Sequence, residues 1–353
     1  MGQRHTVRFE PVGLEIEADE NETVLQAAFR QGVMLMHGCK EGQCSACKSF
    51  LIEGEVDLER YSTFALADHE QEEGYTLLCR AHAFTDLEVE LLHFDEEMLK
   101  SGVPIQTATT EVRAIEPLTH DIRRLELKLV DPPELAFNAG QYVDITIPGA
   151  QATRAFSMAN TPATDDRLVF MIKLYPGGRF SSLLDGGLAA GDPLQVKGPY
   201  GVFVLREHSD GDLIFVGGGA GMAPIWSLLN SMAERGIDRK ATYYYGARTR
   251  RDLYYLAEIA SLEERLPSFR FVPALSEPEP GDGWDGETGL ITEVLDRREG
   301  NLADHEAYLC GPPPMIDAAI PLLQAKGCGE ARIFYDKFTI TASEEEQEVI
   351  RDA

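Results

Sequence analysis

Residues 38–47 read Gly-Cys-Lys-Glu-Gly-Gln-Cys-Ser-Ala-Cys, and a further cysteine, Cys79, follows after 31 intervening residues. This C-x4-C-x2-C run with one distant cysteine is the spacing of plant-type 2Fe-2S ligation, in which four thiolates hold two ferric ions bridged by sulfide. Gly38 and Gly42 let the backbone wrap close to the sulfides, where its N–H groups can donate. A structural zinc site is the alternative, but such sites usually combine two close-spaced pairs of cysteines. The predicted ligands of a 2Fe-2S cluster are Cys39, Cys44, Cys47 and Cys79.

The composition of the chain limits its partners and its compartment. The chain has 353 residues, and 32 Lys and Arg against 59 Asp and Glu give a net charge of −27. This acidic excess argues against nucleic acid or an anionic membrane surface as a partner, because both would repel it, and it favours a basic protein surface. No apolar run reaches the roughly 18 residues of a membrane span, and the first five residues, MGQRH, lack the apolar core of a secretory signal. We therefore expect a cytoplasmic protein, in which thiols stay reduced and clustered cysteines indicate a metal site.

Three blocks with different patterns follow one another along the chain. The first combines short strand-like runs, a helix and the cysteine loop, which suits an α+β module. Ser-Gly-Val-Pro at 101–104 is typical of a linker. Beyond it, β-type segments recur at the spacing of an all-β barrel, and in the last third strands alternate with helices as in a parallel α/β sheet. We expect domains at 1–98, 105–207 and 208–341, with a linker at 99–104 and an acidic tail at 342–353.

In the first block, a helix is expected between strands. Asn21 is a candidate N-cap for a helix over Thr23 to Gln31, in which Val24, Leu25 and Ala28 share one face. Strands are expected at 5–10, 14–18, 48–52, 75–78 and 87–91.

The middle block carries two short motifs with polar groups. Arg-Ala-Phe-Ser at 154–157 lies at the end of an expected strand, where an arginine can clamp a pyrophosphate and a serine hydroxyl can bind a flavin ring nitrogen. Gly-Gly-Arg-Phe-Ser-Ser at 177–182 opens a helix with hydroxyl groups that could serve a phosphate. Each motif alone is equally typical of an ordinary strand and a capped helix. The candidate cofactor-binding residues here are Arg154, Phe156, Ser157, Gly178, Ser181 and Ser182.

The last block begins with a glycine-rich turn. Gly-Gly-Gly-Ala-Gly-Met-Ala-Pro at 217–224 follows an apolar strand and opens a helix, where glycines let the backbone approach a pyrophosphate. It is not a true G-x-G-x-x-G, because Met222 and Pro224 stand where the last glycine would be needed. The candidate residues are Gly217, Gly218, Gly219, Gly221 and Pro224.

The choice of nicotinamide cofactor depends on the segment after the next strand. Gly-Ala-Arg-Thr-Arg-Arg-Asp at 246–252 offers three arginines and one aspartate. A carboxylate at this place favours NAD and arginines favour NADP, so composition alone favours NADP. The pattern Gly-Ala-Arg-x-x-x-Asp-Leu at 246–253 nevertheless resembles that of NADH-using oxygenase reductases, and this resemblance implies NADH, with Arg248 and Asp252 as the candidate contacts.

Taken in this order, the motifs resemble those of known families. The cysteine loop and Leu-Leu-Cys-Arg at 77–80 resemble ferredoxins of the β-grasp fold. The R-x-[YF]-S and G-x-x-S elements, the turn at 217–224 and Tyr-Leu-Cys-Gly-Pro-Pro-Pro-Met at 308–315 resemble the ferredoxin-NADP reductase superfamily, which binds FAD. The resemblance implies a multidomain chain of α+β, β and α/β parts: a β-grasp 2Fe-2S ferredoxin, an FAD-binding β-barrel and a Rossmann-like NAD-binding domain.

This resemblance also implies roles for single residues. Cys310 would lie beside the nicotinamide where hydride passes to the flavin, whereas the alternative is a small buried residue at a strand end. Phe338 would cover the flavin, since Phe-Tyr-Asp-Lys-Phe at 334–338 resembles the family's terminal Glu-Lys-Phe with Asp336 in place of Glu. The catalytic residues implied are Ser157, Cys310 and Phe338, and Gly311 and Pro312 join the cofactor-binding set.

Essentially the whole chain resembles the NADH-dependent reductase components of bacterial multicomponent oxygenases. NADH delivers two electrons as hydride and an iron centre accepts them singly, so a flavin must stand between them. The stretches 35–39, 72–80 and 86–91 are most similar to reductases of soluble methane and propane monooxygenases. We therefore expect NADH, FAD and a 2Fe-2S cluster, with the hydroxylase component of a soluble diiron alkane monooxygenase as partner. The alternatives are the reductase of a Rieske aromatic-ring dioxygenase and a non-turnover electron carrier or redox sensor.

Overall fold

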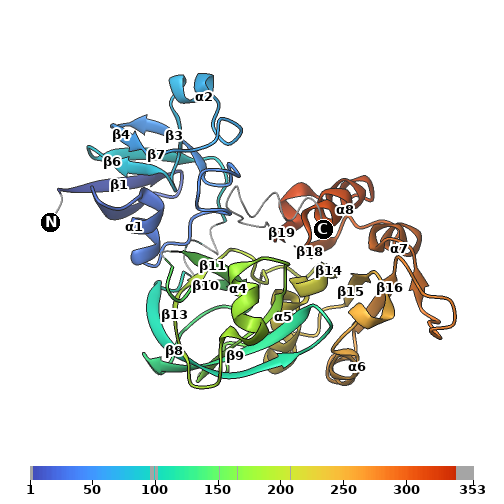
Figure 1. Ribbon diagram of the computed structural model, residues 1–353. Coiled ribbons are helices and arrows are strands. Elements are labelled where there is room, and N and C mark those ends of the chain that lie inside the picture. The colour runs from blue at the N-terminus through green and yellow to red at the C-terminus, as the bar shows by residue number, and fades with distance from the viewer. Residues whose placement is uncertain are drawn as a thin grey trace. The chain divides into compact units, whose positions relative to one another are not determined.

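The computed structural model describes residues 3–95, 99, 102–150, 152–164, 166–206 and 208–338 (Figure 1). Contacts divide the chain into two compact units, one formed by Met1–Gln106 with Gly198–Val202 and the other by Thr107–Lys197 with Phe203–Ala353. The acidic tail expected at 342–353 lies outside the described residues, as do positions 100 and 101 of the expected linker.

A five-stranded sheet in the order β2-β1-β7-β3-β5 forms the frame of the first unit. Strands β1 and β2 form an antiparallel hairpin, and β1 pairs in parallel with β7. Alternate residues of β1 are buried, with Val7 and Phe9 fully inside, as expected for a sheet with one face on a core. The elements are β1 (Arg4–Glu10), β2 (Leu14–Asp19), α1 (Val24–Arg30), β3 (Lys48–Glu53), β4 (Val56–Leu58), α2 (Asp68–Glu72), β5 (Tyr75–Leu77), β6 (Ala81–Ala83) and β7 (Leu87–Leu91).

Helix α1 forms where the sequence predicts it, but its N-cap differs from the prediction. The cap is Thr23, whose Oγ1 accepts from the Gln26 N–H at 3.2 Å, while the Gln26 side chain accepts from the Thr23 N–H at 3.0 Å. The prediction of Asn21 as the cap was wrong, because the Asn21 side chain donates to Asp19 at 2.7 Å. The reciprocal capping box satisfies two backbone donors and fixes where the helix begins.

A six-stranded sheet in the order β11-β10-β13-β8-β9-β12 forms the first part of the second unit. An isolated bridge between Met158 and Phe170 links the ends of this order, so the sheet is nearly closed into a barrel. Its interior is filled by apolar side chains such as Leu125, Val143 and Phe170, all fully buried. The elements are β8 (Gln106–Pro117), β9 (Ile122–Asp131), β10 (Tyr142–Thr146), β11 (Thr153–Ser157), β12 (Arg167–Lys173), α4 (Arg179–Ser182), a π-helical turn (Leu183–Gly187) and β13 (Pro193–Tyr200).

A parallel sheet in the order β17-β16-β15-β14-β18-β19 completes the second unit. Alternate residues of β14 enter two different cores: Phe215 packs with α5 and α6, and Val216 packs with α7 and α8. Helices therefore cover both faces, as in doubly wound folds. The elements are β14 (Asp212–Gly218), α5 (Met222–Arg235), β15 (Ala241–Ala247), a 3-10 turn (Arg250–Asp252), α6 (Leu256–Arg265), β16 (Phe269–Leu275), β17 (Glu287–Thr288), α7 (Ile291–Arg298), β18 (His305–Gly311), α8 (Pro313–Ala325) and β19 (Ile333–Lys337).

The barrel and the parallel sheet share one core. Val169 and Met171 of the barrel belong to the same buried cluster as Tyr243, Tyr254 and Cys310 of the parallel sheet and its loops. These sheets and helices confirm the predicted fold class of α+β, β and α/β parts.

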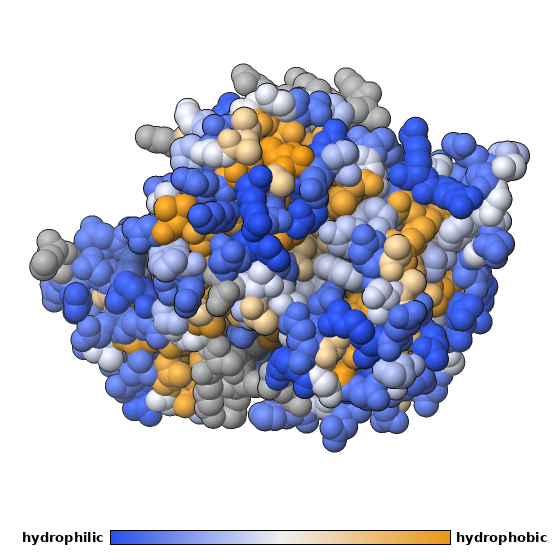
Figure 2. All heavy atoms as spheres, turned by 90° about the horizontal axis from the view of Figure 1, so that it is seen from below, coloured by the Kyte–Doolittle hydropathy of each residue, from blue (hydrophilic) through white to orange (hydrophobic). Residues whose placement is uncertain are grey.

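The described part of the chain has a mostly polar face and short helices. The face of the molecule drawn in Figure 2 is mostly hydrophilic, with separate small apolar patches. Every helix in the described ranges is too short or too polar to cross a lipid bilayer.

Candidate functional site

The cysteine loop lies between α1 and β3, and Cys79 follows β5. Backbone N–H groups point at its sulfurs: those of Glu41 and Gln43 donate to Cys39 Sγ at 3.4 and 3.2 Å, and that of Cys39 donates to Cys44 Sγ at 3.2 Å. Such donors stabilise negative charge on sulfur, which a loop that binds an iron–sulfur cluster requires.

Two glycines of the loop are needed by what surrounds them. A Cβ on Gly38 would lie 2.9 Å from Cys44 Sγ. Gly42 has φ +69°, and a Cβ there would lie 2.8 Å from the Cβ of Tyr61. Lys40 and Ser45 adopt positive φ without being glycines, so the loop keeps a costly backbone shape. The tight wrapping that the sequence predicts is therefore present.

The four predicted ligands lie in two thiol pairs. The hydrogen bond from Cys44 lowers the pKa of Cys39 to about 5, helped by the N–H groups of Glu41 and Gln43. The hydrogen bond from Cys79 lowers the pKa of Cys47 in the same way. The pKa values of Cys44 and Cys79 are raised because these thiols donate to their partners. Four thiols in two hydrogen-bonded pairs, with thiolate character in each pair, are the donor set that an iron–sulfur cluster takes.

His37, next to the loop, has both ring nitrogens engaged. Nδ1 lies 2.8 Å from the Leu35 carbonyl, and Nε2 accepts from the Gly201 N–H at 3.1 Å. Burial lowers the pKa of His37 to about 4, so the ring is neutral at physiological pH, with its proton on Nδ1. His37 therefore holds the loop in place, and its contacts favour a structural role over a ligand role.

The barrel motif at 154–157 lies on the edge strand β11. Arg154 and Phe156 point to one side of the strand, and Ser157 is buried. The ring of Phe156 lies 4.7 Å from that of Phe180. The aromatic side chain therefore packs against the barrel core as well as standing where the motif predicts a flavin.

The second barrel motif forms the turn into α4. The hydroxyl of Ser181 accepts from the Tyr175 N–H at 2.9 Å, and that of Ser182 donates to the Gly178 carbonyl at 3.1 Å. A Cβ on Gly178 would lie 2.9 Å from Ser181 Oγ, so the turn requires a glycine. Within the described residues, the Ser181 hydroxyl therefore acts as an acceptor, whereas the Ser182 hydroxyl donates its proton within the turn.

The glycines after β14 fall into two groups. A Cβ on Gly217 would lie 2.6 Å from the Tyr243 hydroxyl, and one on Gly221 would overlap the Cys310 carbonyl. These two glycines serve close packing of the sheet. Gly219 is different, since it has φ +55° and open space around its Cα. The turn lies where the strand order reverses between β14 and β18, which is the place where doubly wound folds bind ligands.

The predicted catalytic residues of the parallel sheet lie together at its carboxyl edge. Cys310 is fully buried, opposite Gly217 on one side and Asp336 on the other. The Phe338 N–H donates to the Gly311 carbonyl at 3.0 Å. Burial raises the pKa of the Cys310 thiol well above its usual range and that of Asp336 to about 6. The thiol therefore stays protonated, and Asp336 is a carboxyl group that titrates near neutral pH.

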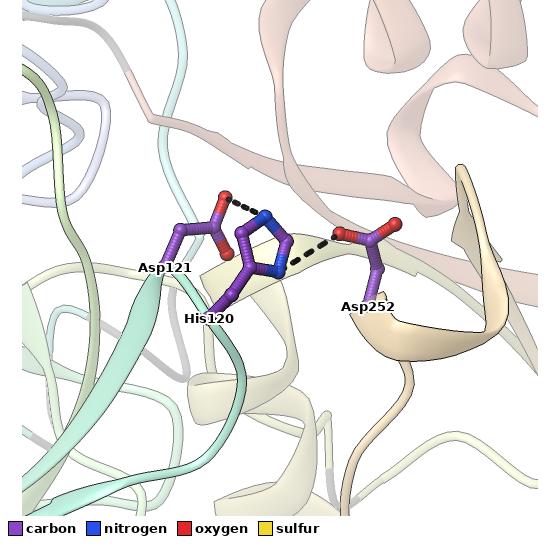
Figure 3. A group of neighbouring side chains, drawn as sticks. All are labelled: His120, Asp121 and Asp252. Carbon is purple, nitrogen blue, oxygen red and sulfur yellow. Dashed lines mark ion pairs between the residues drawn. The ribbon is translucent and has the colours of Figure 1, made fainter.

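Asp252 has partners that sequence reasoning missed (Figure 3). Its Oδ2 accepts from the Thr249 N–H at 2.8 Å and from the Thr249 hydroxyl at 2.7 Å. Its Oδ1 lies 3.7 Å from Nδ1 of His120, whose Nε2 lies 3.6 Å from Asp121. The ammonium of Lys173 pairs with Asp121, which favours an ion-pair network over a metal site. No local sequence pattern predicts this network, because its members come from separate strands and loops. Arg248 stays exposed, and its carbonyl accepts from the Glu277 N–H at 2.8 Å.

Comparison with protein families defines the class of this chain. It matches the 2Fe-2S iron-sulfur cluster binding domain over residues 7–83, the oxidoreductase FAD-binding domain over 109–205 and the oxidoreductase NAD-binding domain over 215–320. The chain is thus an iron–sulfur flavoprotein of the NADH:acceptor oxidoreductases. The three matched domains confirm the predicted cofactors, which are a 2Fe-2S cluster, FAD and NADH.

Individual relatives narrow the class. A propane 2-monooxygenase reductase component from Mycolicibacterium goodii is 51% identical over 96% of this chain and 98% of its own. The reductase component DmpP of a phenol 2-monooxygenase from Pseudomonas sp. is 39% identical over 96% of this chain and 95% of its own. The crystal structure of the Amycolatopsis cytochrome P450 reductase GcoB is 32% identical and aligns with a TM-score of 0.85 over 96% of this chain and 100% of its own. The chain belongs to the family of NADH-dependent reductase components of multicomponent monooxygenases.

Proposed function

We propose that this chain is the reductase component of a soluble diiron alkane monooxygenase, with propane as the favoured substrate of the complete enzyme. The observation that carries the proposal is the similarity to propane 2-monooxygenase reductases over nearly the full length of both chains. Such a reductase serves an oxygenase component, and we infer that this component is a diiron hydroxylase in the cytoplasm. The domain boundaries proposed above, 1–98, 105–207 and 208–341, are supported by three family matches that fall inside them.

The residues of the chain have separate tasks in this mechanism. When bound, FAD and the 2Fe-2S cluster convert the two-electron chemistry of NADH into single-electron transfers. We assign Cys39, Cys44, Cys47 and Cys79 to the cluster, and the motifs on β11 and α4 to FAD. The turn at Gly219 would hold the NADH pyrophosphate, because it combines an open backbone with the start of α5.

Cys310 would border the place where hydride passes. Its neutral, buried thiol adds bulk and no charge, so it can exclude water without attracting protons. Phe338, tied to Gly311, would close the same place from β19. Ser157 would orient the flavin with its hydroxyl. These roles are supported by the grouping of Cys310 and Phe338 at one sheet edge.

The reductase of a Rieske aromatic-ring dioxygenase remains the second candidate, because the ferredoxin-first domain order serves both kinds of oxygenase. An electron carrier without turnover is a third possibility, and complete flavin and nicotinamide motifs count against it. Oxidation of NADH with ferricyanide as acceptor would exclude that possibility directly.

The deciding experiment measures electron transfer from NADH to a purified diiron alkane hydroxylase and, separately, to a Rieske oxygenase. Both are measured anaerobically, at low and at high salt. Fast reduction of the diiron protein alone, slowed by salt, is the expected result, because an acidic reductase is steered to its partner by charge. Preference for the Rieske protein would keep the cofactors and overturn the proposed partner.

A further inference from the structure

Phe64 is the most exposed large apolar side chain in the described part of the chain, at 97%. It lies on a turn between β4 and α2. Two hydrogen bonds to Ser62 stabilise this turn: the Phe64 N–H donates to Ser62 Oγ at 3.3 Å, and the Ala65 N–H donates to the Ser62 carbonyl at 2.9 Å. Its neighbours Ala65 and Leu66 are buried. The ring therefore projects into water from a fixed turn, although burying it would be favourable.

The turn that carries Phe64 is hydrogen-bonded to the cysteine loop. The Ser62 N–H donates to the Gly42 carbonyl at 3.0 Å, and Tyr61 is the side chain that a Cβ on Gly42 would strike. Of the four predicted ligands, Cys44 is exposed to solvent, and it lies on this loop, whereas Cys47 and Cys79 are buried. A protein that takes an electron from the cluster must approach the edge where a ligand meets solvent, and Phe64 stands on the turn that borders that loop.

The segment around this turn carries mostly negative charge. Residues 59–73 hold five carboxylates, and the basic side chains among them are Arg60 and His69. Glu70 pairs with Lys48 at 2.6 Å, and Glu59 pairs with Arg80. Among the residues that the structure describes, Asp68, Glu72 and Glu73 have no ion-pair partner, and all three are exposed. An apolar ring in an acidic segment is complementary to an apolar pocket with a basic rim.

We propose that Phe64 is the apolar anchor of the surface that docks the oxygenase component, whose apolar, basic-rimmed pocket receives the ring. This inference rests on the proposed function, since it assumes an oxygenase as electron acceptor. Aromatic side chains that become buried at the centre of an interface often carry most of its binding energy, while surrounding charges steer the encounter.

The test compares two exposed phenylalanines of the first unit in the full-length holoprotein. Phe64→Ala removes the anchor, and Phe84→Ala is the control, because Phe84 is 64% exposed on the turn between β6 and β7. The measurements are the Kd for the oxygenase component, the rate of its reduction, and the rate at which NADH reduces the cluster within the chain. We expect Phe64→Ala to raise the Kd at least about tenfold. Phe84→Ala should stay within about twofold of the wild type, and Phe64→Leu should retain part of the affinity.

Each other outcome contradicts the proposal in a specific way. Equal effects of the two alanine variants on the Kd would show that Phe64 contributes no more to docking than another exposed phenylalanine. Slower reduction of the cluster by NADH, with an unchanged Kd, would mean that the ring serves the flavin-bearing part of this chain instead. A wild type that reduces only a Rieske oxygenase contradicts the proposed function, and the Phe64 comparison is then made with that oxygenase. A wild type that reduces the diiron hydroxylase, with no effect of Phe64→Ala, contradicts the docking surface alone.

Discussion

Gly42 meets two requirements at one position. Its φ of +69° suits glycine, and its Cα faces the Cβ of Tyr61 so closely that a methyl group would strike it. Gly13, with φ +64° and open space, meets only the first requirement. Alanine substitutions at Gly42 and Gly13 therefore distinguish the free-energy cost of the left-handed backbone from the cost of steric crowding.

We expect Gly42→Ala to lower the cluster content of the purified protein by half or more, because the loop must open to relieve the contact. Gly13→Ala has only the left-handed backbone to adopt, at about 1–2 kcal/mol, and should retain its cluster. Iron and sulfide per chain, with the visible absorption of the cluster, measure the difference. Equal losses in the two variants would show that crowding at Gly42 is unimportant.

We expect Asp336 to make the stability of the second unit depend on pH. Burial raises its pKa in the folded state to about 6, from an ordinary value of 3.8. Between these two values the folded state binds more protons than the unfolded state, so this group lowers the free energy of unfolding as the pH rises from about 4 to 6.

Asp336→Asn should remove that decline. The free energy of unfolding of the variant, relative to the wild type, should increase from pH 4 to pH 6 and then stay constant. Urea unfolding followed by circular dichroism at several pH values measures it. A difference that does not change with pH would contradict the raised pKa.

At the scale of single elements, hydrogen bonds between Thr249 and Asp252 stabilise the 3-10 turn Arg250–Asp252. Asp252 accepts two hydrogen bonds from Thr249 and faces His120, so its carboxylate shapes the turn after β15. If Asp252 serves nucleotide binding as proposed, we expect it to act through the shape of this turn as well as through direct contact.

Thr249→Val should therefore resemble Asp252→Asn. We expect both to raise the KM for NADH about 3- to 10-fold, with little change in kcat measured with ferricyanide, because binding is weakened and the place of hydride transfer is untouched. A large effect of Asp252→Asn with none of Thr249→Val would assign Asp252 to direct contact alone.

Elements that depend on local pattern could be predicted from the sequence. The cysteine loop, helix α1 and the strand–turn–helix at β14 were all expected near the positions they occupy. Contacts between distant segments could not be predicted. Asn21 and Thr23 are both good capping residues, and the choice between them depends on how β2 ends and where Asn21 finds Asp19. The pairing of Asp252 with His120 likewise depends on tertiary structure.

At the scale of the whole molecule, the two redox tasks belong to separate parts of the chain. The four predicted cluster ligands lie in the first unit, and the flavin and nicotinamide motifs lie in the second. We therefore expect ferricyanide to be reduced at the flavin, and cytochrome c to be reduced through the cluster.

Cys44→Ser should abolish NADH-driven reduction of cytochrome c and leave most of the ferricyanide activity, because it removes one cluster ligand and no part of the second unit. Steady-state rates with the two acceptors, normalised to FAD content, give the comparison. Parallel loss of both activities would show that the parts depend on one another for folding or function.

The short segment Gly198–Val202 has a consequence for recombination between related genes. It is preceded and followed by residues of the second unit, yet Gly201 donates to His37 and Tyr200 lies against Phe29 and Lys40. A crossover placed in the linker at 99–104 would therefore exchange most of the first unit and leave one of its pieces behind. We expect a chimaera to work better when the N-terminal hundred residues and this pentapeptide come from the same parent, so that the ferredoxin part is transferred in two pieces.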